Sequence, residues 1–136
     1  MAFRIWLCVA ALCGLTSVAA AGYGAHTLNG ITTFSTVVKI YETGQLFHVL
    51  HSIVLFGIAI LFAATEGWRG PLAHWALQIS AVAFLLGIVL FSGGIYAGVL
   101  SGAQAGVPVV PAGGGLFLLG WVALAISAFG FRRNPS

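Results

Sequence analysis

The amino-acid sequence predicts an all-α integral membrane protein, a compact bundle of four transmembrane helices. Of the 136 residues, 60% are hydrophobic and only 5% are charged, whereas a soluble domain carries about a quarter charged residues. The sequence also contains several apolar runs long enough to cross the roughly 30 Å hydrocarbon core of a bilayer. We therefore expect residues 1–136 to form a single four-span transmembrane domain.

The first predicted span covers about residues 5–21 and follows Arg4. Its basic start and its small residues at 19–21 are also typical of a secretory signal peptide. The run is long enough to span the bilayer, however, and we expect it to be retained. Cys8 and Cys13 lie about 140° apart around this helix, so they cannot pair with each other. We interpret both as buried small hydrophobic residues.

The other spans are predicted at about residues 46–64, 75–99 and 116–131. The charged turn EGWRG separates the second span from the third, and Pro71 suits the first turn of the next helix. Residues 101–115, SGAQAGVPVVPAGGG, are interpreted as a loop whose last glycines give a flexible entry to the fourth span. Four spans place both termini on one side of the membrane.

Basic residues predict the orientation. One side carries Arg4, Arg69, Arg132 and Arg133, and the other carries only Lys39. The positive-inside rule therefore places both termini in the cytoplasm, in a multi-pass protein of the cell inner membrane. Because these residues flank apolar spans and form no basic stripe, we expect the lipid bilayer as a partner and no nucleic acid.

Small residues recur along the third span at a spacing that keeps them on one side of a helix. We interpret this stripe as helix packing within the bundle, with a homo-oligomer contact as the alternative. Its members are Ser80, Ala83, Gly87, Gly94 and Gly98.

A polar patch precedes the second span, in the segment YETGQLFHVLH. Because polar groups at membrane depth are costly in lipid, the patch should face protein. On a helix, one narrow face holds Tyr41, Gln45, His48 and Ser52, with Glu42 and His51 flanking it and Lys39 further round. The predicted topology places His26 on the same side of the membrane, within reach of His48.

Two hypotheses give this patch a chemical role. The first is a metal site, for which His26, His48, His51 and Glu42 supply ligand atoms, or a haem held by His26 and His48, although no H-E-x-x-H pattern is present. The second is proton handling through Glu42, His48 and His51, because ionisable groups inside a membrane often mark such paths. No polar series continues this path across the membrane.

The third hypothesis is structural, and the sequence favours it. Glu42 pairs with Lys39 one turn earlier, while Gln45 and His48 hydrogen-bond the backbone of the loops next to them. Loop backbone at membrane depth needs such partners because no water is available there.

Four motifs carry a family resemblance: GYGAH (22–26), QLFH (45–48), FSGGIY (91–96) and PAGGGLFLLGW (111–121). In this order they resemble the landmarks of the small membrane family labelled domain of unknown function 423, whose eukaryotic relatives are the transmembrane-protein-256-like proteins. The resemblance implies a four-span helical inner-membrane protein and no known enzyme activity.

Lys39, Glu42 and His51 depart from the pattern expected of this family, and they enrich the polar patch. No serine or cysteine has a recognisable catalytic base, so we do not predict an enzyme. We expect a structural or accessory subunit of a larger membrane complex. The alternative is a cofactor-binding or proton-handling unit that uses the same patch.

Overall fold

The computed structural model describes residues 1–28, 35–102 and 107–132, and these ranges are almost entirely helical. Its elements are α1 (Ala2–Tyr23), η1 (Gly24–Leu28), α3 (Ser35–Ala64), α4 (Pro71–Gly87), η2 (Ile88–Ser92), α5 (Gly93–Leu100), α6 (Val109–Ser127) and η3 (Ala128–Gly130). Four continuous stretches are long and apolar enough to cross a membrane: Ala2–His26, Thr36–Ala64, Pro71–Leu100 and Val109–Gly130. The predicted all-α, four-span fold class is confirmed.

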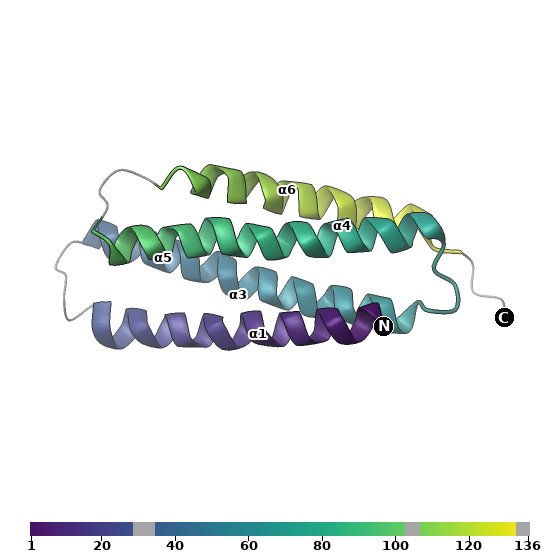
Figure 1. Cartoon of the computed structure of the whole chain (residues 1–136), viewed down its shortest axis with the longest axis horizontal. Coiled ribbons are helices and arrows are strands. Elements are labelled where there is room, and N and C mark those ends of the chain that lie inside the picture. The colour runs from purple at the N-terminus through teal and green to yellow at the C-terminus, as the bar shows by residue number, and fades with distance from the viewer. Residues whose placement is uncertain (29–34, 103–106, 133–136) are drawn as a thin grey trace.

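The helices form two antiparallel pairs. Helix α1 packs along α3, and α6 packs along α4, while α3 joins the two pairs through α4, η2 and α5. The start of α1 and the end of η3 lie at one end of the bundle (Figure 1), which we call the terminal end. The opposite end, where α1 and η1 finish and α3 begins, is called the far end.

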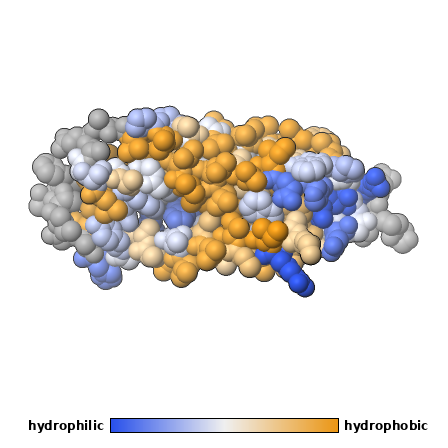
Figure 2. Space-filling view, in the orientation of Figure 1, coloured by the Kyte–Doolittle hydropathy of each residue, from blue (hydrophilic) through white to orange (hydrophobic). Residues whose placement is uncertain are grey.

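The surface of the bundle suits a lipid environment. Figure 2 shows a broad hydrophobic area across the middle of one face, with hydrophilic residues toward both ends. Large apolar side chains are exposed on different helices, among them Leu15 of α1, Ile53 of α3 and Leu118 of α6. A soluble monomer rarely exposes so large an apolar area, whereas lipid tails cover it without cost.

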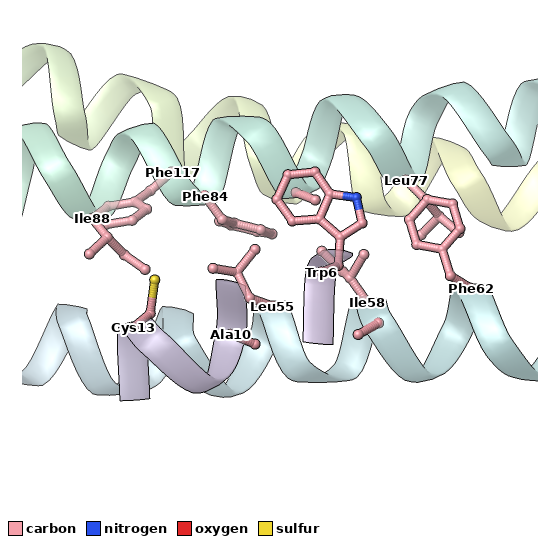
Figure 3. Packing of buried hydrophobic residues seen from close by; sticks show 12 residues of the cluster. Trp6, Ala10, Cys13, Leu55, Ile58, Phe62, Leu77, Phe84, Ile88 and Phe117 are labelled. Atoms are coloured by element: carbon pink, nitrogen blue, oxygen red, sulfur yellow. The ribbon is translucent and has the colours of Figure 1, made fainter. Parts of the chain in front are cut away.

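Aromatic rings fill the space between the two helix pairs. Figure 3 shows Trp6 of α1, Phe62 of α3 and Phe84 of α4 packed in this core. The indole of Trp6 also donates a hydrogen bond from Nε1 to Gln78 Oε1 on α4, at 2.6 Å. These large side chains join the two helix pairs.

Within the α4/α6 pair, glycines receive aromatic rings from the facing helix. A Cβ on Gly87 would meet the Phe117 ring at 2.5 Å, and a Cβ on Gly120 would meet the Phe84 ring at 2.7 Å. Ser80 Oγ adds a hydrogen bond to the Gly120 carbonyl at 2.8 Å. The two helices therefore pack by reciprocal insertion of a ring into the space above a glycine.

The small-residue stripe of the third span is buried throughout: Ser80, Ala83, Gly87, Gly94 and Gly98. Beyond the two contacts above, a Cβ on Gly94 would meet Val110 at 3.0 Å, and one on Gly98 would meet Val107 at 2.7 Å. Four of the five positions thus contact α6 or the residue shortly before it. This is contact within one chain.

The helices extend beyond the predicted spans. Helix α3 begins at Ser35, the motif GYGAH is helical, and the PAGGG segment is helical where the sequence predicted a loop. Helix is favoured because a backbone in lipid must satisfy its hydrogen bonds internally, which outweighs the weak helix propensity of glycine. Cys8 is exposed on the surface of α1, whereas Cys13 is buried as expected.

The third span is also interrupted by the π-helix η2, which the sequence did not predict. There the Gly93 N–H donates to the Ile88 carbonyl, five residues earlier. Ser92 ends this segment, and its hydroxyl is fully buried without a hydrogen-bond partner among the described residues. An unpaired buried hydroxyl costs about 1–3 kcal/mol.

Gly113→Ala tests the close approach of α6 to the third span. A Cβ at Gly113 would meet the Phe91 backbone, with Cα at 2.8 Å, whereas one at Gly115 meets nothing within 4 Å. Because backbone cannot move aside cheaply, we expect Gly113→Ala to lower the free energy of unfolding by about 1–3 kcal/mol. Thermal unfolding in detergent, followed by circular dichroism, measures the effect. Gly115→Ala is the control, and an equal Tm for both variants contradicts this packing.

Candidate functional site

His48 occupies the centre of the candidate site. It lies on α3 and is only 6% exposed. Its Nε2 is 3.3 Å from Thr16 Oγ1 on α1, and its Nδ1 is 3.3 Å from Tyr96 OH on α5. One imidazole therefore connects three helices: α1, α3 and α5.

The neighbouring hydrogen bonds assign the protons of this site. The Thr16 hydroxyl donates to the carbonyls of Leu12 and Cys13 on its own helix, both at 3.0 Å. Its oxygen is then an acceptor for His48, so Nε2 carries the proton of the neutral ring. Nδ1 is left to accept from the hydroxyl of Tyr96. This assignment gives every polar atom of the imidazole a partner.

Tyr41 and Ser52 extend this cluster along α3. The Tyr41 hydroxyl donates to the Ala20 carbonyl of α1 at 2.8 Å, and its ring lies 4.9 Å from that of Tyr96. Ser52 Oγ donates to the His48 carbonyl at 2.7 Å, within the same helix. We call Thr16, Tyr41, His48, Ser52 and Tyr96 the His48 cluster.

His51 lies in a separate, aromatic environment. Its ring stacks on Phe117 with centroids 3.7 Å apart and an interplanar angle of 12°, and Phe84 is 5.3 Å away. Its Nδ1 lies 2.8 Å from the Phe47 carbonyl and donates to it. His51 therefore packs α3 against α4 and α6, and it does not share a partner with His48.

The structure does not bring His26 and His48 together, contrary to the sequence interpretation. His48 lies beside Thr16, and His26 is ten residues further along the first span. At 1.5 Å per helical residue this is about 15 Å. Within residues 1–28, 35–102 and 107–132, no group of three or more His, Cys, Asp or Glu side chains could hold a metal ion.

The predicted pairing of Glu42 with Lys39 is also wrong. Both side chains are exposed at the far end, and neither forms an ion pair with a residue that the structure describes. Gln45 is half-buried and borders a small cavity near Glu42. The polar patch is thus divided: Tyr41, His48 and Ser52 face the bundle interior, whereas Lys39 and Glu42 face outward.

Two members of the His48 cluster were missing from the predicted patch, Thr16 and Tyr96. Each is a polar residue that interrupts an apolar span, which is a signal that the sequence contains. Their pairing with His48 depends on how far each helix is shifted along its neighbours. That register is a property of packing, and no local pattern specifies it.

Comparison with known proteins finds one family model and several similar membrane proteins. The family described as "Protein of unknown function (DUF423)" matches residues 20–114. The UPF0382 membrane protein of Haemophilus influenzae is 31% identical, over 91% of this chain and 93% of its own. The UPF0382 inner membrane protein YgdD of Escherichia coli K12 is 32% identical, over 98% and 96%. The UPF0382 membrane protein YwdK of Bacillus subtilis is 28% identical, over 92% and 96%.

No solved structure matches the chain. The names of the relatives and the four membrane-length helices confirm the predicted multi-pass inner-membrane location.

Tyr96→Phe tests the bond between Tyr96 and His48. It removes only the hydroxyl and leaves Nδ1 of a buried imidazole without a donor, so we expect the free energy of unfolding to fall by about 0.5–1.5 kcal/mol. Tyr23→Phe is the matched control, because the Tyr23 ring packs against Tyr41 but its hydroxyl has no hydrogen bond to a described residue. Equal unfolding midpoints for the two variants in detergent would argue against this bond.

Proposed function

We propose a structural or accessory role for this chain, which belongs to the DUF423 family of small membrane proteins. In this proposal it is a subunit of a larger membrane complex and carries out no reaction itself. The His48 cluster holds its helices in the arrangement that partners recognise.

One observation carries the proposal: both ring nitrogens of His48 are used by hydroxyls of the same chain, those of Thr16 and Tyr96. A histidine that ligates a metal or relays a proton presents at least one nitrogen to the reacting species. His48 instead uses both nitrogens in hydrogen bonds that connect α1 and α5 to α3. A structural subunit needs such a connection between helices at membrane depth.

His48→Ala is the central test of this connection. It leaves Thr16 and Tyr96 without a common partner and opens a cavity, so we expect a loss of about 2 kcal/mol or more in unfolding free energy. His26→Ala is the control, because His26 is exposed. Absorption spectra and metal analysis of the purified protein accompany the unfolding measurement. A Soret band or stoichiometric metal that disappears in His48→Ala, with Tm unchanged, would replace the structural role by a ligand role.

The accessory role is tested separately, by cross-linking in native membranes before extraction in mild detergent. We expect the tagged chain to be recovered in a defined larger species, in equal amount for wild type and His26→Ala and in smaller amount for His48→Ala. Recovery of the chain alone at every concentration would contradict an accessory role. That result would not contradict the stabilising role of the His48 hydrogen bonds, because the unfolding measurement tests that role separately.

We also propose that both termini lie in the cytoplasm. Arg4, Arg69 and Arg132 all lie at the terminal end of the bundle, whereas Lys39 lies at the far end. The positive-inside rule assigns the end with more arginine and lysine to the cytoplasm. A green fluorescent protein fused after residue 136 should therefore fluoresce, while alkaline phosphatase at the same position should be inactive. The opposite pair of results would invert the orientation.

A further inference from the structure

Two cavities lie between α1 and α3. The first, of about 160 Å³, is at the far end. Its lining includes Ala21, Gly24, Ala25, Tyr41, Glu42 and Gln45. The second, of about 210 Å³, lies deeper in the span. Its lining consists of Ala10, Ala11, Gly14, Val49, Ser52, Ile53 and Phe56.

The two cavities lie along the same faces of the first span and α3. On α3, the lining residues Glu42, Val49 and Phe56 are spaced by seven, which is close to two helical turns and keeps them on one face. On the other wall, Gly14 and Ala21 of α1 are also spaced by seven, and Leu28 of η1 continues the lining. We call the surface between these two rows the α1/α3 groove. Tyr41 and Ser52 of the His48 cluster border this groove, whereas the His48 ring lies toward the bundle interior.

The groove changes character along its length. At the far end it presents the carboxylate of Glu42 and the amide of Gln45. Deeper in the span, the lining is almost wholly apolar and opens toward the lipid side through exposed residues such as Ile53. A Cβ built on Gly14 meets nothing within 4 Å, so the surface of α1 is open there.

The distance from the polar end of the groove to its apolar end matches the length of one lipid. From Glu42 to Phe56 is fourteen residues, or about 21 Å at 1.5 Å per helical residue. Half of a bilayer, including its headgroups, is about 20–22 Å thick. A phospholipid aligned with the groove would place its headgroup at Glu42 and one acyl chain along Val49 and Phe56.

The negative charge of Glu42 determines which lipid headgroup the groove favours. Glu42 is an exposed carboxylate without an ion pair to any described residue, and it favours a cation. A primary ammonium donates charge-assisted hydrogen bonds to a carboxylate and to an amide oxygen such as that of Gln45, and a quaternary ammonium has no N–H to donate. A headgroup without any amine offers Glu42 no N–H donor and brings a second negative charge toward it.

We propose that the α1/α3 groove binds one molecule of phosphatidylethanolamine, with its ammonium at Glu42 and an acyl chain in the apolar part beside Gly14. The site is independent of the accessory role proposed above. Its headgroup contacts are Glu42 and Gln45, which are not members of the His48 cluster.

Native mass spectrometry of the purified full-length chain tests this site. Phosphatidylethanolamine, phosphatidylcholine and phosphatidylglycerol with identical acyl chains are titrated separately. We expect one tightly bound phosphatidylethanolamine per chain, and we expect Glu42→Gln to weaken it about tenfold, which is 1.4 kcal/mol. Glu66→Gln, which changes an exposed acid at the terminal end, should have no effect. Equal binding of the three lipids, or an unchanged affinity in Glu42→Gln, overturns the proposal.

A second variant separates the acyl groove from the headgroup site. Gly14→Leu places a side chain in open space, so the protein should fold with an unchanged Tm while phosphatidylethanolamine binding falls. Competition by free ethanolamine at the same affinity as the lipid would show that the ligand is a soluble amine and would refute the lipid. Concentration-dependent dimerisation that displaces the lipid and is lost in Gly14→Leu would assign the groove to a second copy of the chain instead.

Discussion

A histidine at membrane depth must find its hydrogen-bond partners inside the protein, because the hydrocarbon layer offers none. His48 meets this constraint with Thr16 from α1 and Tyr96 from α5. Both bonds are satisfied only when the three helices are aligned at one level along their axes. Apolar packing in lipid permits many alignments of similar energy, since lipid tails and leucine side chains are equally apolar. The imidazole therefore selects one of them.

Glycines of this bundle have two different surroundings. In the α4/α6 pair, Gly87 and Gly120 each receive an aromatic ring from the facing helix, so the space above the glycine is filled by the protein itself. In the α1/α3 pair, Gly14 faces open space beside a cavity. The first arrangement stabilises contact between helices. The second leaves a surface that another molecule must cover, and in a bilayer the nearest molecule is a lipid.

Most of the fold could be predicted from the sequence, but less of the candidate site could. Apolar run length and the scarcity of charge suffice for four helices, because both are set by the thickness of the bilayer. The helical PAGGG segment was missed because glycine propensities measured in water do not apply where the backbone cannot bond to water. Placing His26 beside His48 failed for a different reason. Topology gives the side of the membrane on which a residue lies, but not its depth.

The residues predicted to form one polar patch fall into a buried group and an exposed group. Tyr41, His48 and Ser52 are turned inward and satisfied by protein groups, so changing them alters how the helices fit together. Lys39 and Glu42, on the same helix but rotated outward, have no such bonds to described residues and can change without cost to the bundle. A helix at the membrane surface can thus carry two functions on adjacent residues. The angle of each side chain around the axis, more than its position along the sequence, determines which function it serves.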